Sequence, residues 1–283
     1  MNKFRPIVKY SGVAIFSSFI SFVILDKKWS QQSVKAATLV PNTQPFTPSF
    51  NKRYLDVGVP EENSRLKFFE GYIAYYDKKH RIPSWVMEHL PGAQMNAESK
   101  EKIERQGHEF YEDLSEDPIY RSRSRDYFRS GYDRGHMAAA GNHRFTSKGQ
   151  YNQTFNLINI APQVGDGFNR HPWNQLERYV RTMASNSHDL YCITGSLFIP
   201  EYDNSLKKKF IKFEVIGEND VSVPTHFYKA VAFKKDVSSQ WVTVAWLMPN
   251  ERISTEKVDL NKFQVPLSKI ESHSGYRLFR EIR

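Results

Sequence analysis

The chain has 283 residues, of which 40% are hydrophobic, so it can bury a sizeable core and is not a disordered polypeptide. Its 40 Lys and Arg residues outnumber 31 Asp and Glu residues, and the resulting charge of +9 favours a polyanionic partner such as nucleic acid or an anionic membrane. A basic protein that is merely soluble is the alternative interpretation. With Cys192 as the one cysteine, an intrachain disulfide framework and a cysteine metal cluster are excluded.

The N-terminal segment, residues 1–28, differs in composition from the rest of the chain. Basic residues precede an apolar stretch, Val13–Leu25, and no acidic residue occurs before Asp26. Secretory signal peptides, mitochondrial presequences and uncleaved membrane anchors all have patterns of this kind. No small-residue cleavage site follows the apolar stretch, and the chain has no disulfide framework. We therefore expect this segment to target the protein to mitochondria and to anchor it to a membrane.

Residues 29–53 are rich in Ser, Gln, Thr, Asn and Pro, which predicts a flexible linker ahead of a globular domain over residues 54–283. In this domain, short runs rich in Val, Ile, Tyr, Phe and Trp alternate with polar breaks, as is typical of strands. The expected strands are Tyr72–Tyr76, Phe155–Ile160, Leu190–Phe198, Phe210–Ile216, Phe227–Phe233 and Trp241–Met248.

One segment has the periodicity of a helix instead. Pro172 suits the first position of a helix, and apolar residues then recur at spacings of three or four, namely Trp173, Leu176, Val180 and Met183. Two shorter helices are expected over Pro83–Leu90 and Leu267–Ser272. The sequence therefore predicts an α+β protein with a mixed or antiparallel β-sheet core and one prominent helix after Asn169.

The segment Tyr132–Arg144 is the most informative about chemistry. Arg134, Gly135 and His136 occur in succession, and small residues that let another surface approach closely follow them. A guanidinium can bind two oxygens of a phosphate, while a neutral imidazole can accept a proton from water. On this segment alone, the commoner alternative is a histidine with a structural hydrogen-bonding role.

Asn169 and Glu177 form a second candidate group. Glu177 lies eight positions after Asn169, a little over two helical turns, so the two side chains face roughly one direction. Magnesium retains several waters and needs only one or two protein oxygens, so an Asn with a carboxylate behind it is sufficient. The alternative is that Asn169 or His171 caps the helix and that Glu177 is a solvated surface charge.

Several segments of the chain, from about Tyr72 to the C-terminus, resemble the DNA/RNA non-specific endonucleases of the ββα-metal class. They occur in the same order: Asp133–His136, Asn159, Asn169 with Glu177, Val223–Lys229 and Met248–Asn250. The resemblance implies a ββα-metal motif, hydrolysis of DNA and RNA with little sequence preference, and a homodimer. With the N-terminal segment, it favours the mitochondrial inner membrane or intermembrane space.

The same resemblance assigns roles to individual residues. His136 is the expected general base, and Asn169 the sole direct protein ligand of Mg²⁺ or Mn²⁺. Glu177 would order the waters of that ion, while Arg134 and Asn159 would support the site. An unperturbed imidazole has a pKa near 6.5 and is largely neutral at about pH 7, as a base must be.

Arginines near this segment are candidates for phosphate contacts, which supply affinity without reading sequence. Arg129 and Arg144 are predicted to bind substrate, and Arg105 resembles the family's upstream phosphate-binding arginine. Further basic residues are Arg121, Arg123, Arg125 and Lys148. Since acidic residues intervene, a solvated charge run is the alternative. The chain departs from the family pattern by one extra residue in segment 164–167.

Rival interpretations come from the same fold or from metal chemistry. The family's related mitochondrial 5′-exonuclease/endonuclease is the nearest alternative, although Asp133 favours the endonucleases because some of the exonucleases have Ser there. A nucleic-acid-binding protein without catalysis would share the basic surface, but it has no need of a base and a metal ligand together. A zinc site would need three or four ligands, for which His136, His143 and His171 are the candidates.

Overall fold

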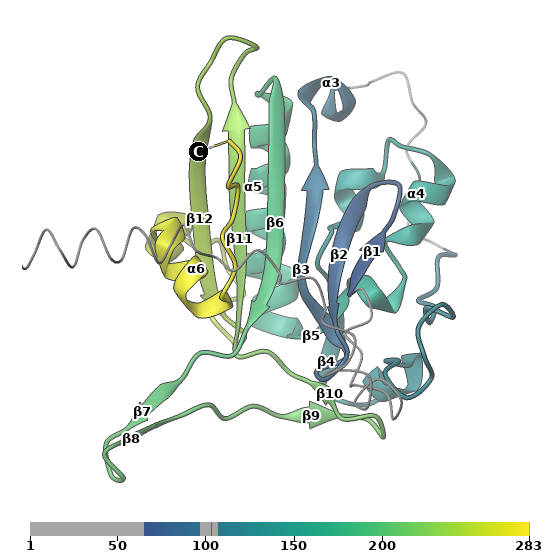
Figure 1. Cartoon of the computed structure of the whole chain (residues 1–283), viewed down its shortest axis with the longest axis vertical. Helices are drawn as coiled ribbons and strands as arrows, with labels where there is room; N and C mark the ends of the chain where they lie inside the picture. The colour runs from purple at the N-terminus through teal and green to yellow at the C-terminus, as the bar shows by residue number, and fades with distance from the viewer. Residues whose placement is uncertain (1–64, 97–102, 104–106, 283) are drawn as a thin grey trace, which may run out of the picture. The chain divides into compact units, whose positions relative to one another are not determined.

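Six antiparallel strands form the central sheet of the computed structural model, which describes residues 65–96, 103 and 107–282. Along the sheet the order is β1, β2, β3, β6, β11 and β12 (Figure 1). All described residues belong to one compact unit, Asn63–Arg283. The strands of the sheet are β1 Leu66–Phe68, β2 Tyr72–Asp77, β3 Ile82–His89, β6 Asp189–Leu197, β11 His226–Lys234 and β12 Val242–Pro249.

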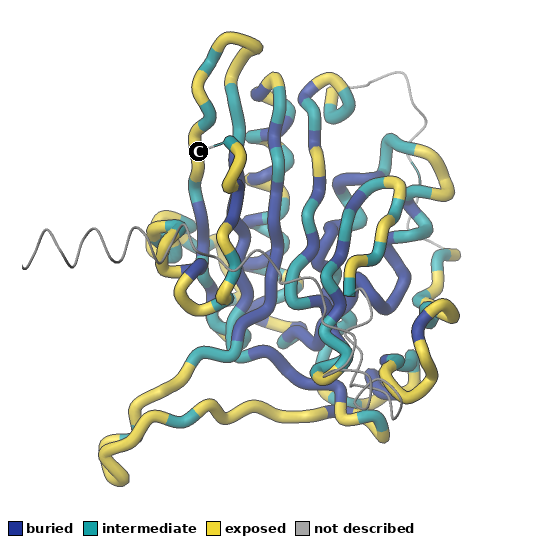
Figure 2. The backbone as a smooth tube through the Cα atoms, in the orientation of Figure 1, coloured by how far each residue is buried: buried dark blue, intermediate teal, exposed yellow. Residues whose placement is uncertain are grey.

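Both faces of the sheet are covered by apolar side chains. On one face, α5 (Asn174–Ser185) packs Leu176 and Val180 into the larger core. On the other, α6 (Leu267–Ser274) contributes Ile270 to a second core (Figure 1). Figure 2 shows that β6 and β11 are consequently buried along most of their length. The predicted α+β class with an antiparallel sheet is confirmed.

Four of the predicted strands are confirmed to within a residue or two. In β6 and β11, continuous runs of β-branched and aromatic residues fit strands that are buried on both faces, whereas β2 and β12 have more accessible residues. The short helix expected near Leu267 is present as α6. The confirmed strands are Tyr72–Tyr76, Leu190–Phe198, Phe227–Phe233 and Trp241–Met248.

The helix predicted over Pro83–Leu90 is wrong, because this segment forms β3 in the middle of the sheet. Its aromatic and β-branched residues fit a pleated strand between β2 and β6. The ladder between β3 and β6 begins at Trp85, and Pro83 lies beside a β-bulge at Tyr75 and Tyr76. The missing N–H of Pro83 therefore costs no hydrogen bond with β6.

The strand predicted over Phe155–Ile160 is wrong for all but its last residue. Asn156 Oδ1 accepts a hydrogen bond from the N–H of Ile158 at 2.9 Å and begins a 3-10 turn, η3 (Leu157–Asn159). The strand itself is β5, Ile160–Val164, which pairs antiparallel with β4, Tyr132–His136. These two strands form a separate ladder beside the main sheet.

A wide helical turn, η4 (Gly165–Trp173), leads from β5 into α5, so the helix does not simply begin at Pro172. Its backbone is non-helical at Asp166 and Gly167, and the φ of +83° at Gly167 favours glycine. Asn169 lies within this helical turn.

Two small ladders extend from one end of the sheet, and β7 and β8 are largely exposed (Figure 2). The strand predicted over Phe210–Ile216 is interrupted, since β8 ends at Phe210 and β9 begins at Val215. The ladders are β7 Glu201–Asp203 with β8 Lys208–Phe210, and β9 Val215–Ile216 with β10 Val221–Ser222. The remaining short helical segments are α3 Gly92–Met95, η1 Ser124–Tyr127, η2 Ala140–His143, α4 Lys148–Gln153 and η5 Leu260–Phe263.

The predicted targeting segment, residues 1–28, and the predicted linker, residues 29–53, lie outside the described residues. Among the residues that are described, none of the helices has the length and apolar character to cross a membrane.

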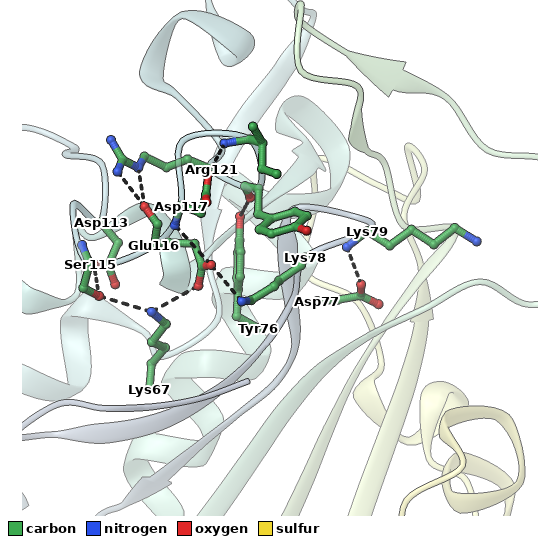
Figure 3. Close-up of polar contacts among 12 residues, drawn as sticks. Lys67, Tyr76, Asp77, Lys78, Lys79, Asp113, Ser115, Glu116, Asp117 and Arg121 are labelled. Carbon is green, nitrogen blue, oxygen red and sulfur yellow. Dashed lines mark hydrogen bonds and ion pairs between the residues drawn. The ribbon is translucent and has the colours of Figure 1, made fainter. Parts of the chain in front are cut away.

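Glu116 ties the loop over residues 107–123 to β1, through Lys67, and to the turn between β2 and β3, through Lys78 (Figure 3). Its buried carboxylate lies 3.1 Å from Lys67 Nζ and 3.0 Å from Lys78 Nζ. Its carbonyl oxygen accepts hydrogen bonds from Arg121. Burial of the carboxyl group opposes its ionisation, but hydrogen bonds and charges from the two lysines outweigh burial and lower the pKa of Glu116.

Glu116→Gln should reduce the free energy of unfolding by about 2 kcal/mol, because two lysine charges lose a buried partner. Since the folded pKa of Glu116 is lowered, its stabilisation is full above the usual value of 4.5 and is lost as pH falls through the folded pKa. Urea unfolding at about pH 7 and about pH 3 measures the difference between wild type and variant, which should shrink at low pH.

Glu112→Gln is the control, because Glu112 makes a longer and more exposed ion pair of 3.9 Å with Arg121. It should cost less than about 0.5 kcal/mol. Equal losses in the two variants, or a loss for Glu116→Gln that does not change with pH, would contradict the role given to the Glu116 carboxylate.

Candidate active site

A polar cleft of about 450 Å³ lies between β4, η2 and the first half of α5. Five arginines and one glutamate among its lining residues make it cationic, which suits phosphate groups. The lining residues are Arg134, His136, Ala140, Gly141, Arg144, Tyr151, Asn169, Arg170, Asn174, Glu177, Arg178 and Arg181. The cleft therefore brings together five of the predicted site residues, namely Arg134, His136, Arg144, Asn169 and Glu177.

His136 ends β4 and enters the cleft with its imidazole packed against two aromatic rings that also contact each other. The ring centroids lie 5.0 Å from Phe155, edge to face, and 5.3 Å from Phe110. At the preceding position, a Cβ on Gly135 would lie 2.2 Å from the side chain of Gln163, so glycine is required for β4 to pair this closely with β5. These contacts restrict rotation of the imidazole.

Arg134 lies two residues before His136 and therefore on the same face of β4. Its Nη2 donates to the carbonyl oxygen of Ser124 at 2.9 Å. The guanidinium carbon stands 5.3 Å from the ring centroid of Phe110 and 5.8 Å from that of Tyr127. Stacking on aromatic rings orients the guanidinium and holds a cation next to His136 in the cleft.

Asn159 is fully buried and holds the backbone that follows His136. Its Oδ1 accepts from the N–H of Ala138 at 2.7 Å, and its Nδ2 donates to the carbonyl oxygens of Ala138 and Thr154 at 2.9 and 2.8 Å. The N–H of Met137 donates to the carbonyl oxygen of Asn159 at 2.9 Å. Asn159 therefore supports the backbone next to His136 and does not itself line the cleft.

Asp133 fixes the amide of Asn169. Asn169 Nδ2 donates to Asp133 Oδ2 at 2.9 Å, so Oδ1 is the amide atom left for a ligand in the cleft. Arg170 binds the same carboxylate through Nε and Nη2, at 2.9 and 2.6 Å, and this hydrogen bonding raises the pKa of Arg170. The strand that carries His136 is thereby joined directly to the turn that carries Asn169.

Asn169 and Glu177 supply oxygen donors to one cleft, and Glu177 stands in the first turn of α5. Amide and carboxylate oxygens are the ligands that Mg²⁺ and Mn²⁺ prefer, and such ions complete their shell with water and substrate phosphate. The two side chains therefore fit a hard divalent cation. Asn169 would bind it directly, and Glu177 would bind the waters around it.

The histidines of the zinc hypothesis do not come together. His143 is buried, with Nε2 at 3.0 Å from Glu88 Oε1. His171 Nε2 lies 3.2 Å from Asp166 Oδ1. Neither residue lines the cleft beside His136.

The cleft also contains arginines that the sequence analysis missed, and Arg181 is the most deeply placed of them. Its Nη1 donates to Asn142 Oδ1 at 3.0 Å. Burial lowers the pKa of Arg181, and the carboxylates of Glu177 and Glu88 oppose that shift. Glu177 and Arg181 are four residues apart on α5, and this helical spacing is the sequence signal that could have revealed the residue. The other missed arginines are Arg170 and Arg178.

The remaining arginine predictions have mixed outcomes. Arg144 lines the cleft, as expected of a substrate-binding residue. Arg129 is exposed outside it, with its guanidinium 5.1 Å from the ring centroid of Phe128. Arg121 binds the carbonyl oxygen of Glu116 on the loop described above. Arg105 lies outside the described residues.

A model of the family described as DNA/RNA non-specific endonuclease matches residues 50–283 of the chain. The chain belongs to this family. It is therefore a nuclease, an enzyme that hydrolyses phosphodiester bonds, and the resemblance noted in the sequence is confirmed.

Several curated proteins are similar to this nuclease over most of their length. It is 38% identical to Endonuclease G, mitochondrial, of Caenorhabditis elegans over 88% of this chain and 78% of that one. It is 32% identical to the Mitochondrial nuclease of Saccharomyces cerevisiae (93% and 82%) and 37% identical to Endonuclease G, mitochondrial, of Homo sapiens (75% and 68%). These names support a mitochondrial location for the nuclease.

A solved structure has the same fold as this nuclease. A chain in the crystal structure of the EndoG/EndoGI complex is 39% identical and superposes with a TM-score of 0.73. The similarity covers 84% of this nuclease and 94% of that chain.

In this nuclease, Asn159→Asp should lower the free energy of unfolding by about 3 kcal/mol, because a carboxylate would face two buried carbonyl oxygens. Urea unfolding measures the loss. At a temperature where the variant remains folded, cleavage should persist within about tenfold of the parental rate, since Asn159 does not reach the cleft.

Asn204→Asp, at an exposed position, is the matched control and should change the free energy of unfolding by less than about 0.5 kcal/mol. An Asn159→Asp enzyme with parental stability and no cleavage would show that Asn159 takes part in the chemistry itself.

Proposed function

We propose that this nuclease cleaves DNA and RNA with little sequence preference, with His136 as general base and Asn169 as the sole direct protein ligand of Mg²⁺ or Mn²⁺. The observation that carries the proposal is the cleft itself, which is lined by His136, Asn169 and Glu177 from different elements. A base and a metal ligand facing one cationic cleft serve hydrolysis, whereas a protein that only binds nucleic acid needs neither.

His136 accepts a proton from the water that attacks phosphorus. Its contacts with Phe110 and Phe155 hold the imidazole in one orientation, so the side chain does not have to rotate before it accepts the proton. Asn169 Oδ1 would bind the cation in the same cleft, and Glu177 would bind its waters. When bound, that cation stabilises the negative charge that gathers on the phosphate oxygens.

Arginines bind the phosphate and its neighbours along the strand. Arg134 and Arg181 reach the cleft beside the reacting centre, while Arg144 and Arg178 extend the cationic lining. Contacts of this kind bind phosphates of DNA and RNA alike and read no base edges. This explains activity on both nucleic acids without sequence preference.

The proposal extends to the organisation of the whole chain. Residues 1–28 act as a mitochondrial targeting and anchoring segment, residues 29–53 as a linker, and residues 54–283 as the nuclease domain. Basic residues ahead of the apolar stretch Val13–Leu25, together with the mitochondrial relatives, support this arrangement. The enzyme works as a homodimer at the inner membrane or in the intermembrane space.

His136→Ala should lower kcat by about 10³-fold and leave DNA binding within about twofold of the parental value, because only the base is removed. Cleavage of plasmid DNA and of RNA measures kcat, and fluorescence anisotropy in chelator measures binding. His188→Ala removes an exposed histidine beyond the C-terminal end of α5 and should keep parental activity. Parental cleavage by the His136→Ala enzyme would remove this residue from the mechanism.

Thorough removal of divalent ions should abolish cleavage, and Mg²⁺ or Mn²⁺ should restore it. Asn169→Ala should raise the ion concentration needed for half-maximal activity by about tenfold or more, since it removes the direct protein ligand. Activity titrations with each ion measure the shift. The control is Asn186→Ala, at the exposed end of α5. Cleavage that survived removal of the ions would contradict the assignment of Asn169.

A further inference from the structure

A chain of buried polar side chains leads from the central sheet to the cleft. Glu88, on β3, has no exposed side-chain surface, and its Oε1 accepts a hydrogen bond from Asn142 Nδ2 at 2.9 Å. Asn142 Oδ1 accepts in turn from Arg181 Nη1 at 3.0 Å. A single amide thereby connects a buried carboxylate to a guanidinium that lines the cleft.

His143 fixes the same carboxylate from a second direction. Its Nε2 lies 3.0 Å from Glu88 Oε1, and its Nδ1 lies 3.4 Å from Gln150 Nε2. With Gln150 donating to Nδ1, the imidazole donates through Nε2–H to Glu88. Gly71 encloses the ring, because a Cβ there would lie 2.7 Å from it. Glu88 is consequently held in the position that meets Asn142.

Burial makes this arrangement costly for stability unless the charge is compensated. Within the described residues, Glu88 Oε2 accepts no hydrogen bond, so the polar contacts of the carboxylate pass through Oε1. Arg181 supplies positive charge at the other end of the connection and interacts electrostatically with Glu88. The buried carboxylate and the guanidinium in the cleft therefore compensate each other through Asn142.

The geometry of Arg181 shows what the connection achieves. Among the described residues, its guanidinium makes its hydrogen bond through Nη1 to Asn142. Gly141 lets the group lie close to the backbone, because a Cβ there would lie 2.8 Å from Nη1. A guanidinium is planar, so fixing Nη1 also fixes the directions of the other N–H donors. Those donors are left for a phosphate in the cleft.

We propose that Glu88 is a positioning residue of this nuclease, which aims Arg181 at the substrate phosphate by acting through Asn142. This inference rests on the proposed function, because the phosphodiester in the cleft is the group that Arg181 binds. Without the negative charge of Glu88, the hydrogen bond from the Asn142 amide weakens, and Arg181 turns towards Glu177, its other nearby carboxylate. The phosphate then loses a cation although every residue that touches it is unchanged.

The test compares Glu88→Gln, Arg181→Met and the double variant in the full chain. We expect kcat/KM to fall about tenfold in Glu88→Gln and about a hundredfold in Arg181→Met. The double variant should match Arg181→Met within about twofold, since Glu88 then has nothing left to position. Effects that multiply in the double variant would overturn the proposal.

Glu271→Gln is the matched control. Glu271 is a second buried carboxylate, paired with Arg277 at 3.0 Å and located on α6, on the opposite face of the sheet. Its substitution should keep kcat/KM within about twofold of the parental value. If Glu271→Gln lowered kcat/KM as much as Glu88→Gln does, neutralising any buried carboxylate would harm the enzyme. That result would overturn the positioning role of Glu88.

DNA binding in chelator, measured over a range of salt concentrations, separates this inference from catalysis. The slope of log affinity against log salt should fall in magnitude by about one in both Glu88→Gln and Arg181→Met, because each loses one phosphate contact. Asn142→Ala breaks the same connection and should show the same slope, even where Glu88→Gln does not fold.

The two proposals fail in different ways. A parental enzyme that binds DNA but does not cut it would reject the proposed function, and the salt slopes would still decide the role of Glu88. An enzyme that cuts DNA while Glu88→Gln and Asn142→Ala keep the parental slope would overturn the positioning role alone.

Discussion

The pairing of β4 with β5 is the constraint on which the rest of the site depends. Side chains alternate along a strand, so a shift of one residue in this ladder would turn His136 away from the cleft. Gly135 permits the close approach of the two strands, and Asn159 locks the backbone beyond them. At the other end of β4, Asp133 binds Asn169. One short ladder therefore sets the position of His136, the proposed base, relative to Asn169, the proposed metal ligand.

Five arginines line one cleft, and each guanidinium that must keep a fixed direction needs its own contacts with the protein. Arg134 stacks on aromatic rings, Arg170 is bound by Asp133, and Arg181 is held by Asn142 in front of the buried Glu88. The supports come from different elements, so contacts within the protein set the directions of these three guanidiniums. A preorganised cationic site stabilises charge that develops on a phosphate without the cost of reorganisation.

Sequence patterns predicted the features that depend on local periodicity. The strands β2, β6, β11 and β12 and the helix α5 follow from runs and repeats of apolar residues, and the segment around His136 was recognisable from its residue order. One misread element was β3, where Pro83 suggested a helix start because the bulge that accommodates it is a tertiary feature. The Glu88 connection to Arg181 could not be predicted either, since it joins residues 93 positions apart (181 minus 88) through packing alone.

The most direct test of the account is a crystal structure of the enzyme with Mn²⁺ and a short DNA, in which anomalous scattering locates the ion. The account predicts one ion on Asn169 Oδ1, with a phosphate lying between it and the imidazole of His136. An ion bound away from Asn169, or a phosphate out of reach of His136, would contradict the convergence of base and metal ligand on one scissile bond.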